Sequence, residues 1–562
     1  MKTLRSKSCI LSMGIVVCVA TFLIFFRWTD FVTSVPPYIY PCIQNGTWGK
    51  HVHPSQSDTL GVENWPRHQL DDSDPLNVPY TVHYLWCGDA EAKFRFKDYL
   101  SLTSVVRVLQ PVKVILHYTV LPRDDSYNTW STWFAMSTPA LHLQQLKDTS
   151  IPCGSEEMLD AVLAILEPQG GIFVGQGVIL ARAPTDFNTV SLATHFSDSP
   201  DKTRGVLYAN RRFPDPDTRL QLLELILSSP ASCVSEDDYN QDIEEDPFCI
   251  SLSDSVLYPK DIMFSETRFA QLARWLFYGK RAPVVIKKDP DNLIPRISHY
   301  IKLSGQNEYS SELNFNHFLN MLSALYIGGF RHVYLHAEEE PRGQWWEELQ
   351  SESVTWVKIE PIDTVFRQDI RQKAHVSDVI RYLILYKYGG AYQDFDVTWV
   401  SHVNDSLLAC PFVHAFDWVI NGEWPEYINN GVMFSRRHSD WLRLFIETLK
   451  EYRDEEWNFN SGLVPYKMFE KHPDLVCLDR HVQVLCHGGI CYPPWTEDYR
   501  RPLGNTRSTS PFSLQEVFAI HTTEPKLIPS LQSTQNLKKS TDDFGHFMRH
   551  VLIISGRRYL LQ

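Results

Sequence analysis

The chain has 562 residues, of which 43% are hydrophobic, and it carries a formal net charge of −14 with a pI of about 5.8. This acidic balance excludes a nucleic acid as the main partner, because binding a phosphate backbone needs an excess of lysine and arginine. The length exceeds what one small domain needs, so more than one folded unit is expected.

An uncharged stretch at residues 9–26 follows three basic residues, Lys2, Arg5 and Lys7. Its length is near the short end for a membrane-spanning helix, and the basic flank keeps residues 1–8 in the cytosol. The stretch therefore predicts a signal anchor, and with it a single-pass type II protein of the Golgi membrane, or of the ER, whose remaining chain is lumenal. A cleaved signal peptide is the alternative.

Residues 27–76 form a polar, proline-containing segment that we interpret as a stem. The sequons at Asn45 and Asn404 predict glycosylation if the chain is lumenal. Of the 11 cysteines, Cys9 and Cys18 lie in the anchor, which leaves nine without a zinc-type spacing. Scattered disulfides together with one free thiol are therefore expected, and not a zinc site.

The rest of the chain contains an internal repeat. The offset between Phe96 and Phe315, 219 residues, also relates Gly170-Gly171 to Gly389-Gly390. A constant offset over such a distance predicts two copies of one fold, residues 77–230 and residues 292–530. The intervening residues 231–291 contain an acidic run whose like charges repel, so they are predicted to form an exposed, mobile linker. Residues 531–562 are expected to form a C-terminal tail.

Within the second copy, residues 294–303 and 331–336 have the composition of strands, and residues 313–326 that of an intervening helix. A strand, a helix and a second strand in this order predict a parallel α/β unit, in which ligands bind at the carboxyl ends of the strands. The expected fold class is therefore α/β.

Residues 378–388 predict a buried helix that ends at Gly389-Gly390, and residues 391–400 predict a strand. Alternation along that strand would place Asp394 and Asp396 on one face. At about 6 to 7 Å apart the two carboxylates would repel by about 2 to 3 kcal/mol at an effective dielectric constant of 20, so the pair indicates a bound cation. Oxygen ligands of this kind suit Mg²⁺ or Mn²⁺.

Two less specific interpretations stay open at this point. Asp-x-Asp triplets are frequent in an acidic chain, and one also occurs at Asp289 and Asp291. On the predicted helix, Asp378 and Arg381 share a face three residues apart, which is also typical of a surface ion pair worth under about 1 kcal/mol.

The run Ser377-Asp378, Arg381, Leu385, Gly389-Gly390, Tyr392 and Asp394-x-Asp396 closely resembles the DXD sugar-transferase domain of glycosyltransferase family 32. This family includes α-1,6-mannosyltransferases and α-1,4-galactosyl- and N-acetylglucosaminyltransferases. The resemblance implies a Rossmann-like GT-A fold, a nucleotide-sugar donor, a divalent metal, Mn²⁺ or Mg²⁺, and transfer with retention of anomeric configuration.

The resemblance also implies roles for individual residues. Donor-binding residues would be His299, Asp378, Arg381, Tyr392 and Asp394, and the metal ligands would be Asp394, Asp396 and His521. Catalytic residues would be Asp394, Asp396 and Asn430. A tryptophan that the family usually has shortly after the histidine of the first strand is replaced here by Lys302 and Leu303, which puts the nucleobase contacts in doubt.

For Asn430 and His521 a second interpretation remains, since Asn-Gly is a common turn and a single histidine is usually structural. At the repeat offset, Gly175 and Gly177 stand where the second copy has Asp394 and Asp396. The first copy is therefore predicted to be a degenerate transferase-like domain.

The expected activity is retaining, metal-dependent transfer of a hexose or N-acetylhexosamine from a nucleotide sugar to a glycan on a glycoprotein or glycolipid. A UDP-sugar is the favoured donor. No covalent nucleophile is evident in the motif, which favours front-face transfer. Two alternatives are a non-catalytic carbohydrate-binding or scaffold protein and a nucleotide-sugar hydrolase.

Overall fold

The computed structural model of the chain describes residues 81–562 except 90, 124–129, 131–137, 139–140, 168–169, 184–191, 210–215, 229, 242–246, 304–310, 361, 418–426, 488–489, 493–516 and 523–527. The predicted anchor, the stem and Asn45 lie outside the described residues. In the part of the chain that is described, no helix has the length and apolar character needed to span a membrane.

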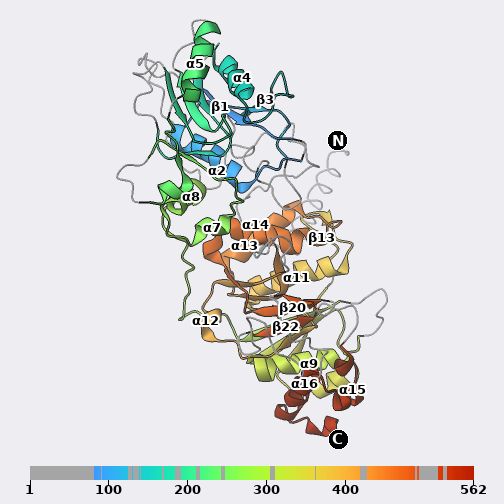
Figure 1. Cartoon of the computed structure of the whole chain (residues 1–562). Coiled ribbons are helices and arrows are strands. Elements are labelled where there is room, and N and C mark those ends of the chain that lie inside the picture. Colours follow the sequence, from blue (N-terminus) through green and yellow to red (C-terminus); the bar gives the residue numbers. More distant parts are fainter. Residues whose placement is uncertain are drawn as a thin grey trace, which may run out of the picture.

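The first unit is built on a six-stranded sheet in the order β3-β2-β1-β4-β7-β6 (Figure 1). Its strands β1 to β4 run parallel, and β7 is antiparallel to both of its neighbours. Burial on both faces explains the continuous apolar runs in β1 and β2. The strands are β1 (Thr81–Trp86), β2 (Lys113–Tyr118), β3 (Leu141–Gln145), β4 (Gly171–Val174), β6 (Leu192–Phe196) and β7 (Gly205–Ala209).

The second unit is built on a seven-stranded sheet in the order β12-β11-β10-β15-β18-β17-β19. Strands β12, β11, β10 and β15 are parallel, and β18 runs antiparallel to β15 and β17. The predicted strands at residues 294–303 and 331–336 correspond to β10 and β11. The strands are β10 (Ile297–Lys302), β11 (His332–Ala337), β12 (Val354–Lys358), β15 (Gly390–Gln393), β17 (Phe412–Phe416), β18 (Ile428–Ser435) and β19 (Cys477–Asp479).

Helices cover both sheets. In the first unit they are α2 (Phe96–Ser104), α4 (Glu156–Leu166) and α5 (Pro216–Ser228), and in the second α9 (Phe315–Ser323), α10 (Gln344–Leu349), α11 (Lys373–Tyr388), α13 (Asp440–Thr448) and α14 (Val464–Lys471). Both α2 and α9 continue into a π-helical turn, Val105–Leu109 and Ala324–Gly328. Over six strands the two sheets therefore have the same spatial order and the same strand directions.

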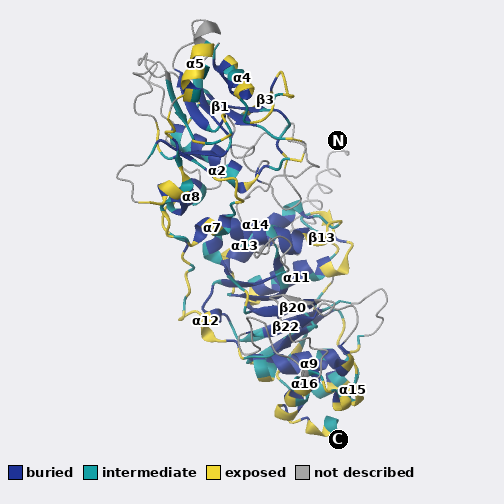
Figure 2. Ribbon diagram, in the orientation of Figure 1, coloured by how far each residue is buried: buried dark blue, intermediate teal, exposed yellow. Residues whose placement is uncertain are grey.

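The prediction of a mobile linker at residues 231–291 is wrong. This segment contains β8 (Val234–Ser235), α6 (Glu236–Tyr239), β9 (Cys249–Ser251), α7 (Pro259–Met263) and α8 (Arg268–Tyr278). Its apolar side chains, among them Tyr239, Ile250 and Leu272, are buried in the same core as β1 and α2 (Figure 2). Apolar residues in α8 at helical spacing outweigh the acidic run, so the segment completes the first unit.

The prediction of a C-terminal tail at residues 531–562 is also wrong. Helices α15 (Thr534–Lys539) and α16 (Asp543–Ile554) pack on the second unit, where α16 contacts α9. Met548, Val551 and Leu552 are buried in the core that also contains Leu319. The second unit therefore extends to the C-terminal helical segment.

The two units make direct contact. The Tyr278 hydroxyl at the end of α8 donates a hydrogen bond of 2.8 Å to the Glu470 carbonyl in α14. Met263 of α7 is buried in the cluster that contains Trp441 and Phe445 of α13. In Figure 1, α7 accordingly lies next to α13 and α14. The junction is thus formed by the segment that was expected to be a linker.

Disulfides link Cys87 to Cys153, Cys233 to Cys249 and Cys410 to Cys477. The expectation of several scattered disulfides is confirmed. In the second unit, Cys410 and Cys477 connect the neighbouring strands β17 and β19 at one side of the sheet. Such bonds persist in oxidising compartments and are rare in the cytosol of most cells.

A smaller four-stranded sheet, in the order β16-β22-β20-β21, lies beside the carboxyl end of β15. Its strands are β16 (Val397–Trp399), β22 (Ala519–Thr522), β20 (Gln483–His487) and β21 (Ile490–Tyr492). Strand β16 directly follows β15 in the chain but pairs with β22. The residues between β15 and β16 therefore sit where the two sheets meet.

Candidate active site

Asp394 and Asp396 lie in a turn and not in one continuous strand. Residues 391–400 were expected to form a single strand, but β15 ends at Gln393 and β16 begins at Val397 in the other sheet. The Val397 amide donates a hydrogen bond of 3.2 Å to the Asp394 carbonyl, which closes the turn. The strand prediction is wrong because pairing with β22 redirects the chain, so the turn and not strand alternation brings the two carboxylates together.

His521 of β22 completes a group of three potential metal ligands with Asp394 and Asp396. The His521 Nε2 atom lies 3.1 Å from Asp396 Oδ1 and 3.9 Å from Asp394 Oδ2. One ligand atom from each of the three residues lies within 4.8 Å of the others. The two carboxylates suit Mn²⁺ or Mg²⁺, and the imidazole adds a ligand of the kind that transition metals accept, so these residues fit the implied divalent cation.

The backbone around the three ligands fixes their orientation. The His521 Nδ1–H donates a hydrogen bond of 3.2 Å to Gln483 Oε1, which leaves Nε2 directed at the carboxylates. The Thr522 amide donates to the Asp396 carbonyl at 3.1 Å. Burial lowers the pKa of His521, but the charges of Asp396 and Asp394 outweigh it, so that the pKa is raised above its ordinary value.

Gly431 of β18 has no room for a side chain. A Cβ atom at this position would lie 2.3 Å from Cε1 of His521 and 2.8 Å from Oδ2 of Asp394. Its carbonyl accepts a hydrogen bond of 2.9 Å from the Asp394 amide. Glycine is therefore needed here because the backbone of β18 packs directly against two of the candidate ligands. Asn430 and Gly431 lie within β18, so the alternative interpretation of Asn-Gly as a turn is wrong.

Asp378, Arg381 and Asn430 form a buried polar cluster next to the three ligands. Asp378 and Arg381 are only 8% and 5% exposed, with Arg381 Nη2 lying 3.2 Å from Asp378 Oδ1. The Asn430 side-chain amide donates a hydrogen bond of 2.8 Å to the same carboxylate oxygen. The alternative of a surface ion pair is wrong, because both side chains are buried. A buried ion pair is costly unless each charged group has hydrogen-bond partners, and here each has them.

Electrostatics connect this cluster to the acidic turn. Arg381 Nη2 lies 3.5 Å from Asp394 Oδ1, and its guanidinium lies 4.3 Å from the centre of the Tyr392 ring. The Tyr392 hydroxyl donates a hydrogen bond of 2.6 Å to Asp394 Oδ1. Burial would lower the pKa of Arg381, but Asp394 and Asp378 raise it above its ordinary value. Arg381 is therefore a permanent cation between the two carboxylates.

Asn320 of α9 holds the acidic turn in position through two hydrogen bonds, a role that no sequence motif indicated. Its Nδ2 donates 2.7 Å to the carbonyl of Phe395, the residue between the two aspartates. Its Oδ1 accepts a hydrogen bond of 2.7 Å from the Thr398 hydroxyl. Asn320 is almost fully buried, so it rigidly links α9 to the turn. The available signal was the pair Asn316 and Asn320, four residues apart on a largely apolar helix.

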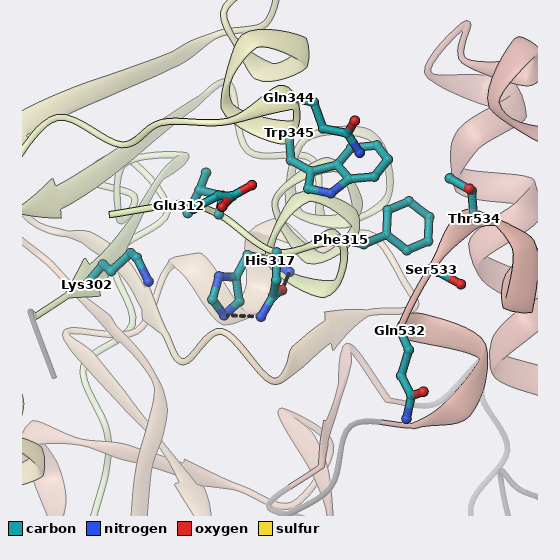
Figure 3. Close-up of a pocket in the computed structure, with 11 residues that line it drawn as sticks. Lys302, Glu312, Phe315, His317, Gln344, Trp345, Gln532, Ser533 and Thr534 are labelled. Atoms are coloured by element: carbon teal, nitrogen blue, oxygen red, sulfur yellow. Dashed lines mark hydrogen bonds between the residues drawn. The ribbon is translucent and has the colours of Figure 1, made fainter. Parts of the chain in front are cut away.

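A cavity of about 450 Å³ adjoins the turn on the side of α9 (Figure 3). The His317 ring lies 4.2 Å from the Phe395 ring, which connects the cavity to the acidic turn. Burial lowers the pKa of His317 to about 3, so the ring is neutral. The cavity is lined by Lys302, Glu312, Leu313, Asn314, Phe315, His317, Gln344, Trp345, Gln532, Ser533 and Thr534. Three of these come from the C-terminal segment, which explains why sequence motifs missed the cavity.

His299 does not belong to the site. It is 1% exposed, and its Nε2–H donates 2.9 Å to the Gly389 carbonyl at the other end of β15. Its Nδ1 lies 3.0 Å from His336 Nε2. Both ring nitrogens are engaged, so the predicted donor contact is wrong and His299 instead packs between strands. The exposed Asn404 accepts a hydrogen bond from the Leu407 amide at 2.9 Å as the cap of α12 (Asp405–Leu408), and its glycosylation stays a prediction.

In the corresponding turn of the first unit, Gly175, which stands where the second unit has Asp394, has no space for a side chain. A Cβ atom on Gly175 would lie 1.9 Å from the Thr203 carbonyl oxygen. Gln176, between the two glycines, donates 3.2 Å to the buried Asp98 carboxylate. Neighbouring backbone therefore occupies the volume that the Asp394 side chain would need.

Residues 327–411 match the model of a family described as a glycosyltransferase sugar-binding region containing a DXD motif. This span contains Asp378, Arg381, Asp394 and Asp396. Glucan organizing enzyme 1 of Cryptococcus neoformans var. grubii is 24% identical over 266 residues, which cover 46% of this chain and 70% of that protein.

Two solved structures show weaker similarity. The galactosyltransferase LgtC, solved with donor and acceptor sugar analogues, is 13% identical, with a TM-score of 0.27 over 45% of this chain and 94% of LgtC. The glycosyltransferase GlyE of Streptococcus pneumoniae is 12% identical, with a TM-score of 0.24 over 56% and 91% of the two chains. At these scores the two similarities carry no argument. On the family match, the resemblance found in the sequence is confirmed for residues 327–411, which are similar to the DXD-containing sugar-binding region of glycosyltransferases.

Proposed function

We propose that the protein is a retaining, metal-dependent glycosyltransferase that moves a hexose or N-acetylhexosamine from a nucleotide sugar, preferably a UDP-sugar, to a glycan on a glycoprotein or glycolipid. The observation that carries the proposal is the convergence of Asp394, Asp396 and His521 on one point, next to the buried cluster of Asp378, Arg381 and Asn430. A carbohydrate-binding or scaffold protein would not need both groups together.

Asp394, Asp396 and His521 would hold the Mn²⁺ or Mg²⁺ ion. When bound, the ion offsets the charge that develops on the leaving diphosphate, as a Lewis acid. The chain's own residues orient the ligands, since Gln483 fixes the His521 ring and Asn320 fixes the turn. Preorganised ligands of this kind lose little free energy to rearrangement when the reaction occurs.

The cavity of about 450 Å³ beside Phe395 is the proposed place of the donor nucleotide. It is lined by the aromatic side chains of Phe315 and Trp345 and by the cationic Lys302, which suit a base and a phosphate respectively (Figure 3). Lys302 of strand β10 stands where the family has a tryptophan, so Trp345 of helix α10 would supply the aromatic surface. The cavity has the size expected for a small-ligand site.

Retention is proposed to proceed by front-face transfer. The buried Asp378 carboxylate accepts a hydrogen bond from Asn430 and lies 3.2 Å from Arg381 Nη2. A carboxylate stabilised from two sides is a weak nucleophile, which supports a role in holding sugar hydroxyls. Asn430 would then present its side chain at the reacting face without forming a bond to the sugar.

The Golgi lumen is the proposed location, with residues 9–26 as the membrane anchor. The disulfides Cys87–Cys153, Cys233–Cys249 and Cys410–Cys477 support an oxidising compartment. The sequon at Asn404 lies on an exposed residue, which supports access to the glycosylation machinery.

The first unit is proposed to be a degenerate copy of the transferase fold that binds neither metal nor donor. The identical strand order of the two sheets supports this, as does the backbone that fills the space beside Gly175. Residues 77–291, expressed alone and titrated by calorimetry with Mn²⁺ and UDP-sugars, are expected to give no binding heat. The second unit under the same conditions is expected to bind both. Tight donor binding by residues 77–291 would contradict this assignment.

Donor turnover tests the proposed function. A panel of UDP- and GDP-sugars is incubated with the full chain and Mn²⁺, with and without an added glycan array, and both nucleotide release and glycan products are measured. We expect release from one donor class that increases when glycans are added. Release that never depends on a glycan would identify a hydrolase, and no release with any donor would identify a binding or scaffold protein.

A further inference from the structure

Trp457 lies beside the first turns of α11, at the edge of the second unit that carries the acidic turn. Helix α11 leads into β15 and runs antiparallel to it, so the first turn of α11 lies at the same edge as Asp394, at the carboxyl end of the strand. Strand β18 runs antiparallel to β15, so it begins at this edge. The π-helical turn Phe459–Leu463, directly after Trp457, packs on β18.

His375 connects Trp457 to the sugar-binding cluster. The two rings lie 5.4 Å apart, and the Trp457 carbonyl accepts a hydrogen bond of 3.3 Å from His375 Nε2. His375 and Asp378 are three residues apart on α11 and therefore share a face of the helix. His375 therefore lies about one helical turn from the carboxylate that is proposed to hold the donor sugar, and the indole packs against His375.

The loop that carries Trp457 is tied down by Asp454. The Asp454 carboxylate accepts hydrogen bonds from His375 Nδ1 at 3.0 Å, from the Tyr452 hydroxyl at 3.0 Å and from the Arg371 amide at 3.0 Å. These bonds fix the loop to the start of α11. An aromatic side chain on an immobilised loop loses little conformational entropy when it binds a ligand.

The Trp457 side chain nevertheless remains exposed. At 60% it is the most exposed aromatic side chain among the residues that the structure describes. Covering this apolar surface would be favourable, because it removes the indole from water. The apolar faces of sugar rings pack well on an indole, whose edge can also donate a hydrogen bond.

We propose that Trp457 is the platform on which the acceptor sugar stacks. The proposal rests on the proposed function in that the bound sugar is taken to be the acceptor, while the binding surface itself does not depend on donor chemistry. The ligand class is a hexopyranoside presented at a glycan end, with its ring lying over the indole and its hydroxyl directed at the cluster around Asp378.

Saturation-transfer NMR on the full chain tests the platform. The probes are methyl glycosides of glucose, galactose, mannose and N-acetylglucosamine, and the variants are Trp457→Ala, Trp457→Phe and the control Tyr388→Ala. Tyr388 is an exposed aromatic residue at the opposite end of α11, and so at the opposite edge of the sheet. Loss of a central aromatic contact is expected to weaken glycoside binding by about tenfold in Trp457→Ala. Trp457→Phe should keep most of the binding, and Tyr388→Ala all of it.

Donor hydrolysis, measured on the same samples with UDP-sugars and Mn²⁺, separates this proposal from the proposed function. Hydrolysis that persists in Trp457→Ala while glycoside binding falls supports the platform. Glycoside binding that depends on Trp457 in a chain without any donor turnover supports the platform and contradicts the transferase. Unchanged binding in Trp457→Ala, no binding of any glycoside by the wild type, or loss of both activities in Trp457→Phe would each overturn the platform.

Discussion

Replacing Asp396 by asparagine is expected to abolish metal-dependent transfer while leaving the fold intact. The substitution removes one charge and almost no volume, and Asp396 is the carboxylate nearest to His521 Nε2, at 3.1 Å. Without it the site keeps two ligands and cannot offset the charge on the leaving diphosphate. Loss of one group that stabilises developing charge lowers kcat by about a hundred- to a thousandfold. Initial rates at a series of Mn²⁺ concentrations measure the effect.

Asp291→Asn is the matched control, because Asp291 belongs to another Asp-x-Asp triplet of this chain and is exposed in a turn. It should have wild-type rates. Thermal unfolding of both variants should coincide with that of the wild type in the presence of a chelator. If Asp396→Asn kept its wild-type rate, or if the wild type were active in chelator, the metal assignment would be incorrect.

Replacing Arg381 by leucine is expected to destabilise the second unit by about 3 to 5 kcal/mol, the cost of leaving a buried charge without its partner. Arg381 faces Asp378 at 3.2 Å and Asp394 at 3.5 Å. Burial raises the pKa of Asp378 and Arg381 opposes that increase, so the pKa should rise further in the variant. Urea unfolding monitored by circular dichroism measures the loss.

The pH dependence of that loss has a definite sign. A carboxyl group whose pKa is higher in the folded than in the unfolded chain binds a proton on folding, so its penalty is full above the folded pKa. The difference in the free energy of unfolding between variant and wild type should therefore shrink as the pH is lowered from 7 towards the pKa of Asp378 in the unfolded chain, about 3.9. The double variant Asp378→Asn with Arg381→Leu should recover part of the stability at pH 7.

Arg371→Leu provides the control for this prediction, since its side chain is 83% exposed and lies just before the same helix. Its unfolding curve should differ from that of the wild type by no more than about 0.5 kcal/mol. A loss in Arg381→Leu that did not depend on pH would show that packing, and not the unpaired Asp378 charge, causes the destabilisation.

Local sequence signals predicted the elements that depend on neighbouring residues. The helix ending at Gly389 was foreseen because the apolar spacing and the glycine pair act within one or two turns, and Gly389 indeed takes a positive φ of 67°. The pairing of Asp378 with Arg381 was foreseen for the same reason, since i and i+3 meet on any helix. A surface ion pair stayed open as an alternative, and the packing of β18 and α13 on α11 decided that the pair is buried.

Predictions from local composition were wrong where burial or strand pairing with a distant segment decided the structure. The acidic run at residues 236–246 indicated a linker, yet apolar residues of α8 that follow it are buried in the first core. Residues 391–400 had the composition of one strand, but pairing of β16 with β22 turned the chain at Asp394. In both cases long-range burial and strand pairing outweighed a local preference.

The sequence by itself determined the α/β class, the order of strand, helix and acidic turn, and the identity of the two aspartates, because each follows from residue types and short-range spacing. Only the tertiary structure decided that His521 completes the ligand group, that Gly431 makes room for it and that Trp457 stands at the same edge. His521 lies 125 residues beyond Asp396 along the chain, and contacts at such a separation arise only when two sheets close against each other.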